Sequence, residues 1–148
     1  MQNTEHQETT VRVRYAETDQ MGVVYHANYL VWFEVGRVEL MRARGIEYKR
    51  MEIDDDCHIV VVEASCRYLA SALYDEVICV RTRIADSRSR TIRFGYEVLR
   101  DTDRQLLATG ETLHVICGSN GKPKMLPEKY RAVLGTPSPA AHAIRGNS

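Results

Sequence analysis

Apolar and polar residues alternate near the start of the chain. Residues 11 to 15 read Val, Arg, Val, Arg, Tyr, which is the period-two pattern of a strand with one buried face. Between residues 28 and 44 the apolar residues instead recur at spacings of three and four, as they do on one face of a helix. The pattern therefore predicts a strand, a short connection and then one long helix.

The predicted helix has recognisable ends. Asn28 is a suitable N-cap, and Gly45 suits the left-handed residue that often terminates a helix. Gly36, in the middle of the helix, should cost about 1 kcal/mol relative to alanine. We therefore expect Gly36 to mark a place where the helix packs closely against another element.

Four β-rich segments follow the helix, after an acidic loop at residues 52 to 56. They are rich in β-branched residues or alternate apolar and polar residues, and turn-forming residues separate them. The predicted strands are residues 57–68, 75–85, 90–100 and 105–117, with a turn at 101–103 and a closing loop at 118–123. Residues 127–134 are expected to form a short helix with Pro127 in its first turn.

A chain of 148 residues without internal repeats fits a single domain. We place this domain at residues 10 to 134 and expect residues 1 to 9 and 135 to 148 to be flexible termini. The long helix must bury its apolar stripe against the only large apolar surface, one face of the sheet. This predicts an α+β fold in which a curved antiparallel sheet wraps around a central helix. Because the other sheet face and the strand edges are natural contact surfaces, we expect a homo-oligomer.

The overall charge excludes some partners. Lysine plus arginine and aspartate plus glutamate number 20 each, so net charge favours neither nucleic acid nor an acidic membrane surface. No apolar run is long enough for a membrane span, and the polar N-terminus does not resemble a signal peptide. We therefore expect a cytoplasmic protein.

The four cysteines are far apart in the sequence. Cys57, Cys66, Cys79 and Cys117 include no CxxC pair, so a zinc site or a redox motif has little support. We expect reduced thiols that pack as small apolar groups in the strands.

The segment from residue 15 to residue 29 joins the predicted strand to the predicted helix. It contains a carboxylate at Asp19, a glycine at Gly22, an imidazole at His26 and three tyrosines. Asp19 can act as a general base on water or attack a carbonyl carbon directly, and its structural alternative is to accept hydrogen bonds from turn amides. Gly22 suits a turn with positive φ, and the helix start offers unpaired N–H groups to a ligand.

The residues of this segment form a specific motif, and later stretches at residues 62–68 and 95–98 fit the same pattern. The motif consists of Tyr15, Thr18-Asp19, Gly22-Val23-Val24-Tyr25-His26 and Asn28-Tyr29. Over about residues 10 to 134 the chain resembles the hotdog-fold acyl-CoA thioesterases of the 4-hydroxybenzoyl-CoA thioesterase type, most closely their YbgC-like branch. The resemblance implies hydrolysis of an acyl-CoA without metal or cofactor, since coenzyme A is part of the substrate. It also implies a dimer or a dimer of dimers, with sites at subunit interfaces.

By this resemblance, catalysis is assigned to Asp19, His26 and Tyr15. The backbone N–H of His26 would hold the thioester oxygen, and loss of such a donor costs about 3 kcal/mol. The His26 side chain would orient the substrate or move a proton. The Tyr15 hydroxyl would position the carboxylate or the acyl group, with core packing as the alternative. A thiolate of pKa about 8.5 leaves with little acid assistance, so one carboxylate can suffice.

Substrate binding is assigned to loop and helix residues around the acyl group and to polar residues that would meet the CoA phosphates. These residues are Gly22, Val24, Tyr25, Tyr29, Arg67, Arg88, Ser89 and Arg90. The turn at residues 87–90 is the preferred phosphate site because arginines bind phosphate well, and a solvated hairpin tip is its alternative. No glycine-rich phosphate loop occurs, which disfavours an NTPase or a nicotinamide enzyme.

Some alternatives remain open at the level of the sequence. Glu34 is a rival carboxylate, because another hotdog subtype uses a helix acid, but we interpret it as an ion-pair partner of an arginine such as Arg37. The chain could also be a non-catalytic module that binds acyl-CoA or acyl carrier protein, although the presence of Asp19 argues against this. A hydratase or dehydratase would need an acid–base pair that we do not find. The other histidines are interpreted as structural: His6, His58, His114 and His142.

Overall fold

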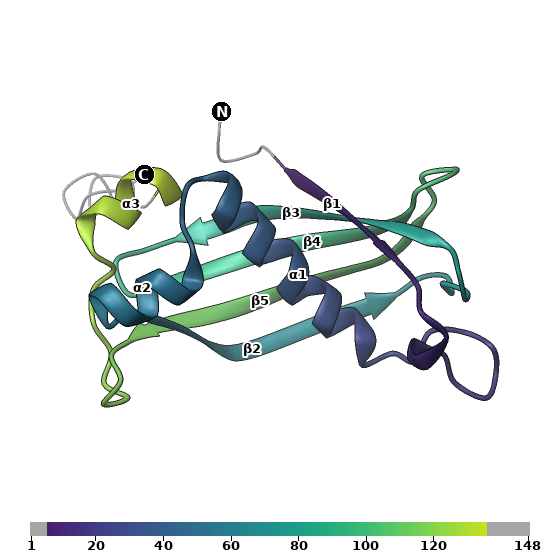
Figure 1. Ribbon diagram of the computed structural model, residues 1–148, viewed down its shortest axis with the longest axis horizontal. Coiled ribbons are helices and arrows are strands. Elements are labelled where there is room, and N and C mark those ends of the chain that lie inside the picture. Colours follow the sequence, from purple (N-terminus) through teal and green to yellow (C-terminus); the bar gives the residue numbers. More distant parts are fainter. Residues whose placement is uncertain (1–5, 136–148) are drawn as a thin grey trace, which may run out of the picture.

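The computed structural model describes residues 6–135, which form a five-stranded antiparallel sheet and three α-helices. The strand order is β1-β3-β4-β5-β2, so β1 and β2 are the edges (Figure 1). The strands are β1 (Gln7–Arg12), β2 (His58–Tyr68), β3 (Val77–Ser87), β4 (Thr91–Arg100) and β5 (Leu106–Cys117). The helices are α1 (Asn28–Ala43), α2 (Tyr48–Asp55) and α3 (Glu128–Leu134). The predicted α+β arrangement is confirmed.

Helix α1 lies across one face of the sheet (Figure 1). Its buried side chains include Trp32 and Phe33, which are 1% and 0% exposed. The Phe33 ring stacks on Tyr96 of β4, with ring centroids 4.3 Å apart. Burial of such rings contributes most of the free energy that holds helix and sheet together.

Close packing at Gly36 is confirmed. A Cβ at this position would overlap the Thr82 hydroxyl and lie 2.9 Å from a methyl group of Val80, both on β3. Only glycine lets the helix backbone approach the sheet this closely.

Of the two predicted ends of α1, only the C-terminal end agrees with the structure. Gly45 has a φ of +83°, its N–H donates to the Arg42 carbonyl, and the Ile46 N–H donates to the Met41 carbonyl. This pair of bonds is a Schellman motif, so the predicted stop is confirmed. The predicted N-cap at Asn28 is wrong, because Asn28 is already helical and its side-chain amide reaches back to the Glu17 carbonyl at 2.9 Å.

Two other boundaries differ from the prediction. Strand β1 begins at Gln7, inside the segment expected to be flexible, and ends before a 3-10 turn at Tyr15–Glu17. The predicted acidic loop at residues 52–56 is wrong for most of its length, because α2 continues to Asp55. Met51 is fully buried and anchors this short helix, while the acidic side chains face solvent or sit at its end.

Strand β2 contains an irregularity in its pairing with β5. Val61 pairs with His114 and Glu63 pairs with Leu113, so Val62 is an extra residue in the strand. Such a β-bulge locally disrupts the ladder and bends the strand.

The expectation of unpaired cysteines fits the described residues. The four cysteines are free thiols, three of them buried and Cys66 half-buried. Within residues 6–135, no helix is long and apolar enough to cross a membrane, and no group of His, Cys, Asp and Glu side chains could hold a metal ion. The predicted tail beyond Gly135 lies outside the described residues.

Candidate active site

The motif residues form a compact loop between β1 and α1. Thr18 and Val24 form an isolated antiparallel bridge, and the Asp19 N–H donates to the Val23 carbonyl at 2.8 Å. The turn between them closes through the Gly22 N–H, which donates to the Asp19 carbonyl at 3.0 Å. Gly22 has a φ of +81°, so the predicted left-handed turn is confirmed.

Asp19 uses its two carboxylate oxygens differently. Its Oδ1 accepts a hydrogen bond from the Met21 N–H at 2.8 Å, which is the turn contact expected of a structural aspartate. Its Oδ2 has no hydrogen-bond partner among residues 6–135. The first contact fixes the orientation of the side chain, and the second oxygen stays available to water or substrate.

The start of α1 presents unpaired backbone donors. The N–H groups of His26 and Ala27 have no acceptor within the described part of the chain, and no side chain caps the helix. The positive end of the helix dipole lies at the same place. These groups can therefore donate hydrogen bonds to an oxygen on which negative charge develops.

Tyr68, at the end of β2, holds this helix start from the sheet. Its hydroxyl donates to the His26 carbonyl at 2.9 Å, and its ring packs edge-on against Tyr29, with centroids 5.1 Å apart. Desolvation of the phenol where it packs against the loop raises the pKa of Tyr68 to about 12, although the residue is 45% exposed, and the hydroxyl remains a donor at neutral pH. Sequence reasoning did not single out Tyr68, although it lies in the stretch that fits the family pattern.

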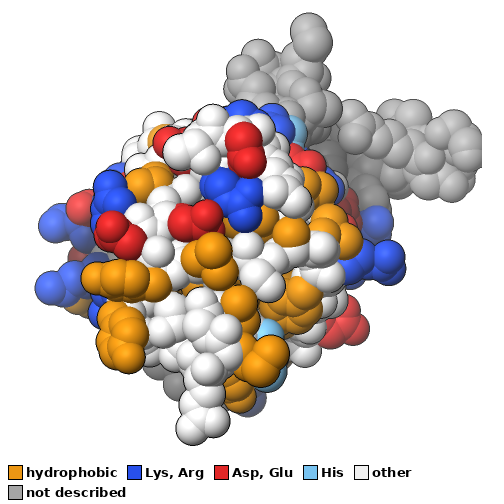
Figure 2. Space-filling model, turned by 90° about the vertical axis from the view of Figure 1, so that its right-hand side faces the viewer, with side chains coloured by type: hydrophobic (Ala, Val, Ile, Leu, Met, Phe, Trp, Pro, Cys, Tyr) orange, Lys and Arg blue, Asp and Glu red, His pale blue; other side chains and the backbone are white. Residues whose placement is uncertain are grey.

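Predicted residues of the acyl site occupy two environments. Val24 and Tyr29 are buried in the core, at 5% and 3% exposure, whereas Tyr25 is half exposed and packs against the His26 ring. Hydrophobic side chains cover much of the molecular surface at this end (Figure 2). They include the exposed residues Met21, Tyr25, Tyr68, Leu69 and Leu73. This surface suits an apolar ligand or a protein partner.

Tyr15 lies on the surface of the motif loop. It is 77% exposed, and its ring packs edge-on against Tyr74, with centroids 5.7 Å apart. Core packing, the alternative considered for Tyr15, is therefore wrong. No hydrogen bond links its hydroxyl to Asp19 within the described residues, so a role in positioning Asp19 stays a prediction.

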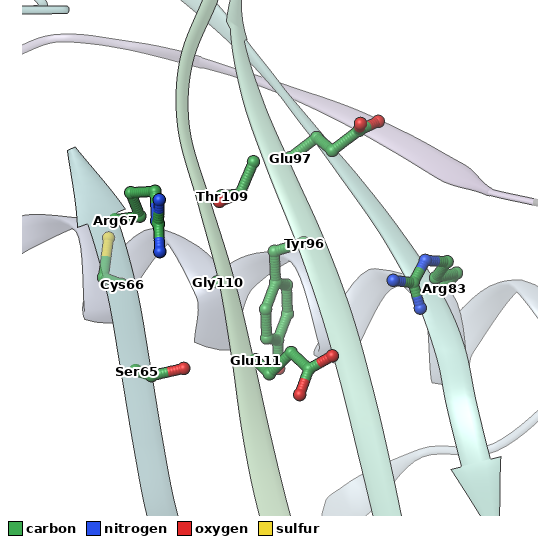
Figure 3. A pocket seen from close by; sticks show the side chains of 9 residues that line it. All are labelled: Ser65, Cys66, Arg67, Arg83, Tyr96, Glu97, Thr109, Gly110 and Glu111. Carbon is green, nitrogen blue, oxygen red and sulfur yellow. The ribbon is translucent and has the colours of Figure 1, made fainter. Parts of the chain in front are cut away.

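Arg67 lies beside Tyr68 but points to the opposite face of the sheet. With Arg83 it lines a hollow of about 470 Å³ on that outer face (Figure 3). Two glutamates at the hollow already have partners: Glu97 pairs with Arg81 at 3.1 Å, and Glu111 pairs with Arg93 at 3.2 Å. Neither Arg67 nor Arg83 has an ion-pair partner among residues 6–135, so both charges remain available to an anion.

The residues Arg88, Ser89 and Arg90 lie at the far end of the molecule from Asp19 (Figure 1). Strand β3 runs from Val77, beside the motif loop, to Ser87 at the turn, and eleven strand residues span roughly 35 Å. The chain therefore does not bring this turn together with Asp19. The turn can serve the same site only from a neighbouring subunit.

The rival carboxylate and the remaining histidines have other surroundings. Glu34 is exposed and forms no ion pair with Arg37 within the described residues, so its interpretation as an ion-pair partner of that arginine is wrong. Arg37 instead donates to the Tyr96 hydroxyl at 3.5 Å. His114 is fully buried, and His58 lies 3.4 Å from Asp56, as expected for structural histidines. His142 lies outside the described residues.

A family model describing the thioesterase-like superfamily matches residues 13–134. The chain belongs to this superfamily. The acyl-CoA thioesterase YbgC of Haemophilus influenzae is 32% identical over 126 residues, which are 84% of this chain and 90% of that protein. The Bacillus subtilis protein YneP is 44% identical over 88 residues, which are 60% of this chain and 63% of YneP.

A solved structure extends the match to the fold. The DHNA-CoA thioesterase of Staphylococcus aureus superposes with a TM-score of 0.85 at 27% identity, covering 97% of this chain and 95% of that one. The thioesterase-like superfamily match and this superposition confirm the predicted hotdog fold and the resemblance to YbgC-like thioesterases. The roles of individual motif residues remain predictions.

Proposed function

We propose that this protein hydrolyses an acyl-CoA to a free acid and CoA, with Asp19 and the start of α1 as its catalytic centre. One observation carries the proposal. The same loop holds a carboxylate with one unpaired oxygen at Asp19 and unpaired N–H groups at His26 and Ala27. A base or nucleophile beside an oxyanion site is what acyl transfer requires. The relationship to YbgC supports the choice of an acyl-CoA as substrate.

The chemistry uses these groups in sequence. The thioester carbonyl oxygen accepts a hydrogen bond from the His26 N–H, which stabilises the negative charge that develops on that oxygen. Asp19 either removes a proton from the attacking water or attacks the carbonyl carbon to form a mixed anhydride that water then hydrolyses. The CoA thiolate leaves without a dedicated acid, because its pKa is about 8.5.

Association into a homo-oligomer forms part of the proposal. Strand β2 is an edge strand of eleven residues, and its exposed side chains include Val60, Val61 and Val62, which are 44%, 42% and 52% exposed. A long apolar edge would aggregate unless something covers it. A second copy of the chain, paired along β2, would cover it and bring a second subunit next to the motif loop.

The catalytic centre is tested by Asp19→Asn. Asparagine keeps the oxygen that accepts the Met21 N–H, so the turn should persist while the charge is lost. We expect wild-type protein to release CoA thiol from at least one member of a panel of short-chain, long-chain and aromatic acyl-CoAs. The variant should lose at least a hundredfold in kcat, as removal of a catalytic base does.

Two outcomes would contradict this proposal. Equal rates from wild type and Asp19→Asn would exclude Asp19 from the chemistry. Saturable binding of acyl-CoA without turnover by the wild type would instead identify a non-catalytic binding module.

Two positions are candidates for binding the CoA phosphates: Arg67 and the turn with Arg88 and Arg90. Their alanine variants can be compared on substrates with and without the phosphates. Arg67→Ala should raise KM for an acyl-CoA about tenfold, because one charge-assisted hydrogen bond contributes roughly 1.5–3 kcal/mol. It should leave KM unchanged for the same acyl group on pantetheine, which lacks the phosphates. If the paired variant Arg88→Ala/Arg90→Ala shows this selectivity and Arg67→Ala does not, the phosphates bind at the turn of a neighbouring subunit.

A further inference from the structure

The motif loop contains a second carboxylate with different surroundings from Asp19. Glu17 is 5% exposed, and both of its carboxylate oxygens accept hydrogen bonds. Oε1 accepts the Arg14 N–H at 2.8 Å, and Oε2 accepts the indole N–H of Trp32 at 3.3 Å. The Arg14 guanidinium lies 3.6 Å from Oε2. The side chain therefore joins the segment just after the first strand to the second turn of α1.

The backbone of the same residue holds the other arm of the loop. The Glu17 carbonyl accepts the Tyr25 N–H at 2.8 Å and the side-chain amide of Asn28 at 2.9 Å. Glu17 is thus bonded to residues on both sides of Asp19 and to the first two turns of the helix. The relative position of Asp19 and His26 depends on these bonds, because both residues lie between the bonded positions.

These contacts make direct participation of Glu17 in the chemistry unsuitable. Both oxygens are already occupied by donors, and the side chain is closed off from solvent. A buried carboxylate is costly unless its partners are in place, so the loop conformation that supplies both partners is strongly favoured. Misplacing a reacting group by about 1 Å can cost a hundredfold in rate.

We propose that Glu17 is a positioning residue, whose carboxylate holds the loop against Trp32 so that Asp19 and the His26 N–H keep the spacing needed for reaction. The inference rests on the proposed function and deepens it. It concerns the rate of the chemical step and not the affinity for substrate, because Glu17 itself does not reach the ligand.

The test is Glu17→Gln in the full chain. Glutamine places an amide NH₂ where one oxygen was, so either the Arg14 N–H or the Trp32 indole N–H faces another donor. We expect kcat on an acyl-CoA turned over by the wild type to fall about tenfold or more, with KM within about threefold. The chain has one tryptophan, so a change in its emission would report directly that the contact has been altered.

Trp32→Phe, alone and combined with Glu17→Gln, tests the same contact from its other side. Trp32→Phe removes the indole donor and keeps an aromatic ring, and on its own it should lower kcat by about threefold. In Glu17→Gln/Trp32→Phe the remaining glutamine oxygen can accept the Arg14 N–H without an opposed donor. The two effects should therefore be less than additive in the double variant. If Glu17→Gln fails to fold, an unchanged kcat in Trp32→Phe overturns the inference.

Asp55→Asn is the matched structural control. Asp55 accepts a hydrogen bond from the Tyr130 hydroxyl and pairs with Lys129 at 3.0 Å, away from the motif loop. Its substitution should lower the free energy of unfolding and leave kcat unchanged. If Glu17→Gln behaves in the same way, with kcat within about twofold of wild type, Glu17 is merely structural and the inference is wrong.

Amide hydrogen exchange separates this inference from the proposed function. In folded Glu17→Gln, exchange should accelerate across residues 15–28 and stay unchanged in β4. If the wild type turns over no acyl-CoA, the proposed function fails, and unchanged exchange in residues 15–28 would still overturn the positioning role by itself.

Discussion

Asp19 shows how far a single residue can be interpreted from sequence. The sequence left open whether its carboxylate bonds turn amides or takes part in chemistry, and the structure gives one oxygen to the turn and leaves the other unpaired. Gly22 was also predictable, because a positive φ in a tight turn is a local property. The contact between Glu17 and Trp32 was not, since it joins residues fifteen positions apart that no local pattern connects.

His114 offers a prediction about pH. It is fully buried, its Nε2 lies 2.8 Å from the Thr112 hydroxyl, and burial, with the nearby Arg37 charge, lowers its pKa from 6.5 to about 3. Between these values the unfolded chain binds a proton that the folded chain does not. The free energy of unfolding should therefore fall as pH decreases from about 6.5 towards 3, by up to roughly 1.4 kcal/mol per pH unit.

Denaturant titrations across this pH range check the prediction. Carboxylates titrate in the same range, so the relevant quantity is the difference between wild type and His114→Gln. That difference should shrink as pH falls, because only the wild type loses the contribution of a neutral buried imidazole. A difference that is constant from pH 7 to pH 4 would show that His114 does not titrate as described.

At the scale of elements, the repeat of apolar residues predicted helices and strands best where an element buries one face. Helix α1 and the last three strands were predictable because their apolar positions repeat in a regular way. Helix α2 was missed because its sequence is mainly charged, and one buried side chain, Met51, does not create a repeat. The prediction of Asn28 as N-cap was wrong because its side chain bonds the Glu17 carbonyl, a tertiary contact that no local pattern shows.

The crossing of α1 over β3 carries a prediction about Gly36. Alanine should gain about 1 kcal/mol in helix propensity, but its Cβ would overlap Thr82, and overpacking typically costs 1–3 kcal/mol. We expect Gly36→Ala to lower the free energy of unfolding by up to roughly 2 kcal/mol in a denaturant titration. Thr82→Ala should recover part of the loss when combined with it, because it removes the overlapping hydroxyl. A Gly36→Ala protein more stable than wild type would contradict the close approach.

At the scale of the whole molecule, the motif loop and the Arg88–Arg90 turn lie at opposite ends of the folded chain. From the sequence alone both segments were assigned to one substrate site. The sequence does not show that the length of β3 holds the two segments apart. Fold and family were nevertheless predictable, because the motif and the order of elements are specific. The resemblance implied sites at subunit interfaces, but the sequence did not show which part of a site a second copy would supply.

The proposed interface along β2 can be tested by adding charge to it. Val60→Lys places an ammonium group on the exposed edge, where pairing with a second copy would bury it. We expect the sedimentation coefficient to fall to that of a monomer and thioesterase activity to fall with it. Val133→Lys on α3 is the control, because Val133 has a similar exposure of 40% and lies outside β2. Equal oligomeric states for both variants and wild type would place the interface elsewhere.

The bulge at Val62 decides which side chains the end of β2 presents to the motif loop. Before the bulge the odd-numbered residue Val61 pairs with the buried His114, whereas after it the even-numbered Tyr68 pairs with the buried Ala108. Successive strand residues point to opposite faces, so the extra residue reverses the phase of the remaining strand. If β2 instead paired regularly through Val62, the register would slip by one residue, Arg67 would turn inward and Tyr68 outward, and the His26 carbonyl would lose its donor. Deletion of Val62 alone should keep this contact, because it removes the extra residue and leaves the pairs from Glu63 to Tyr68 in phase.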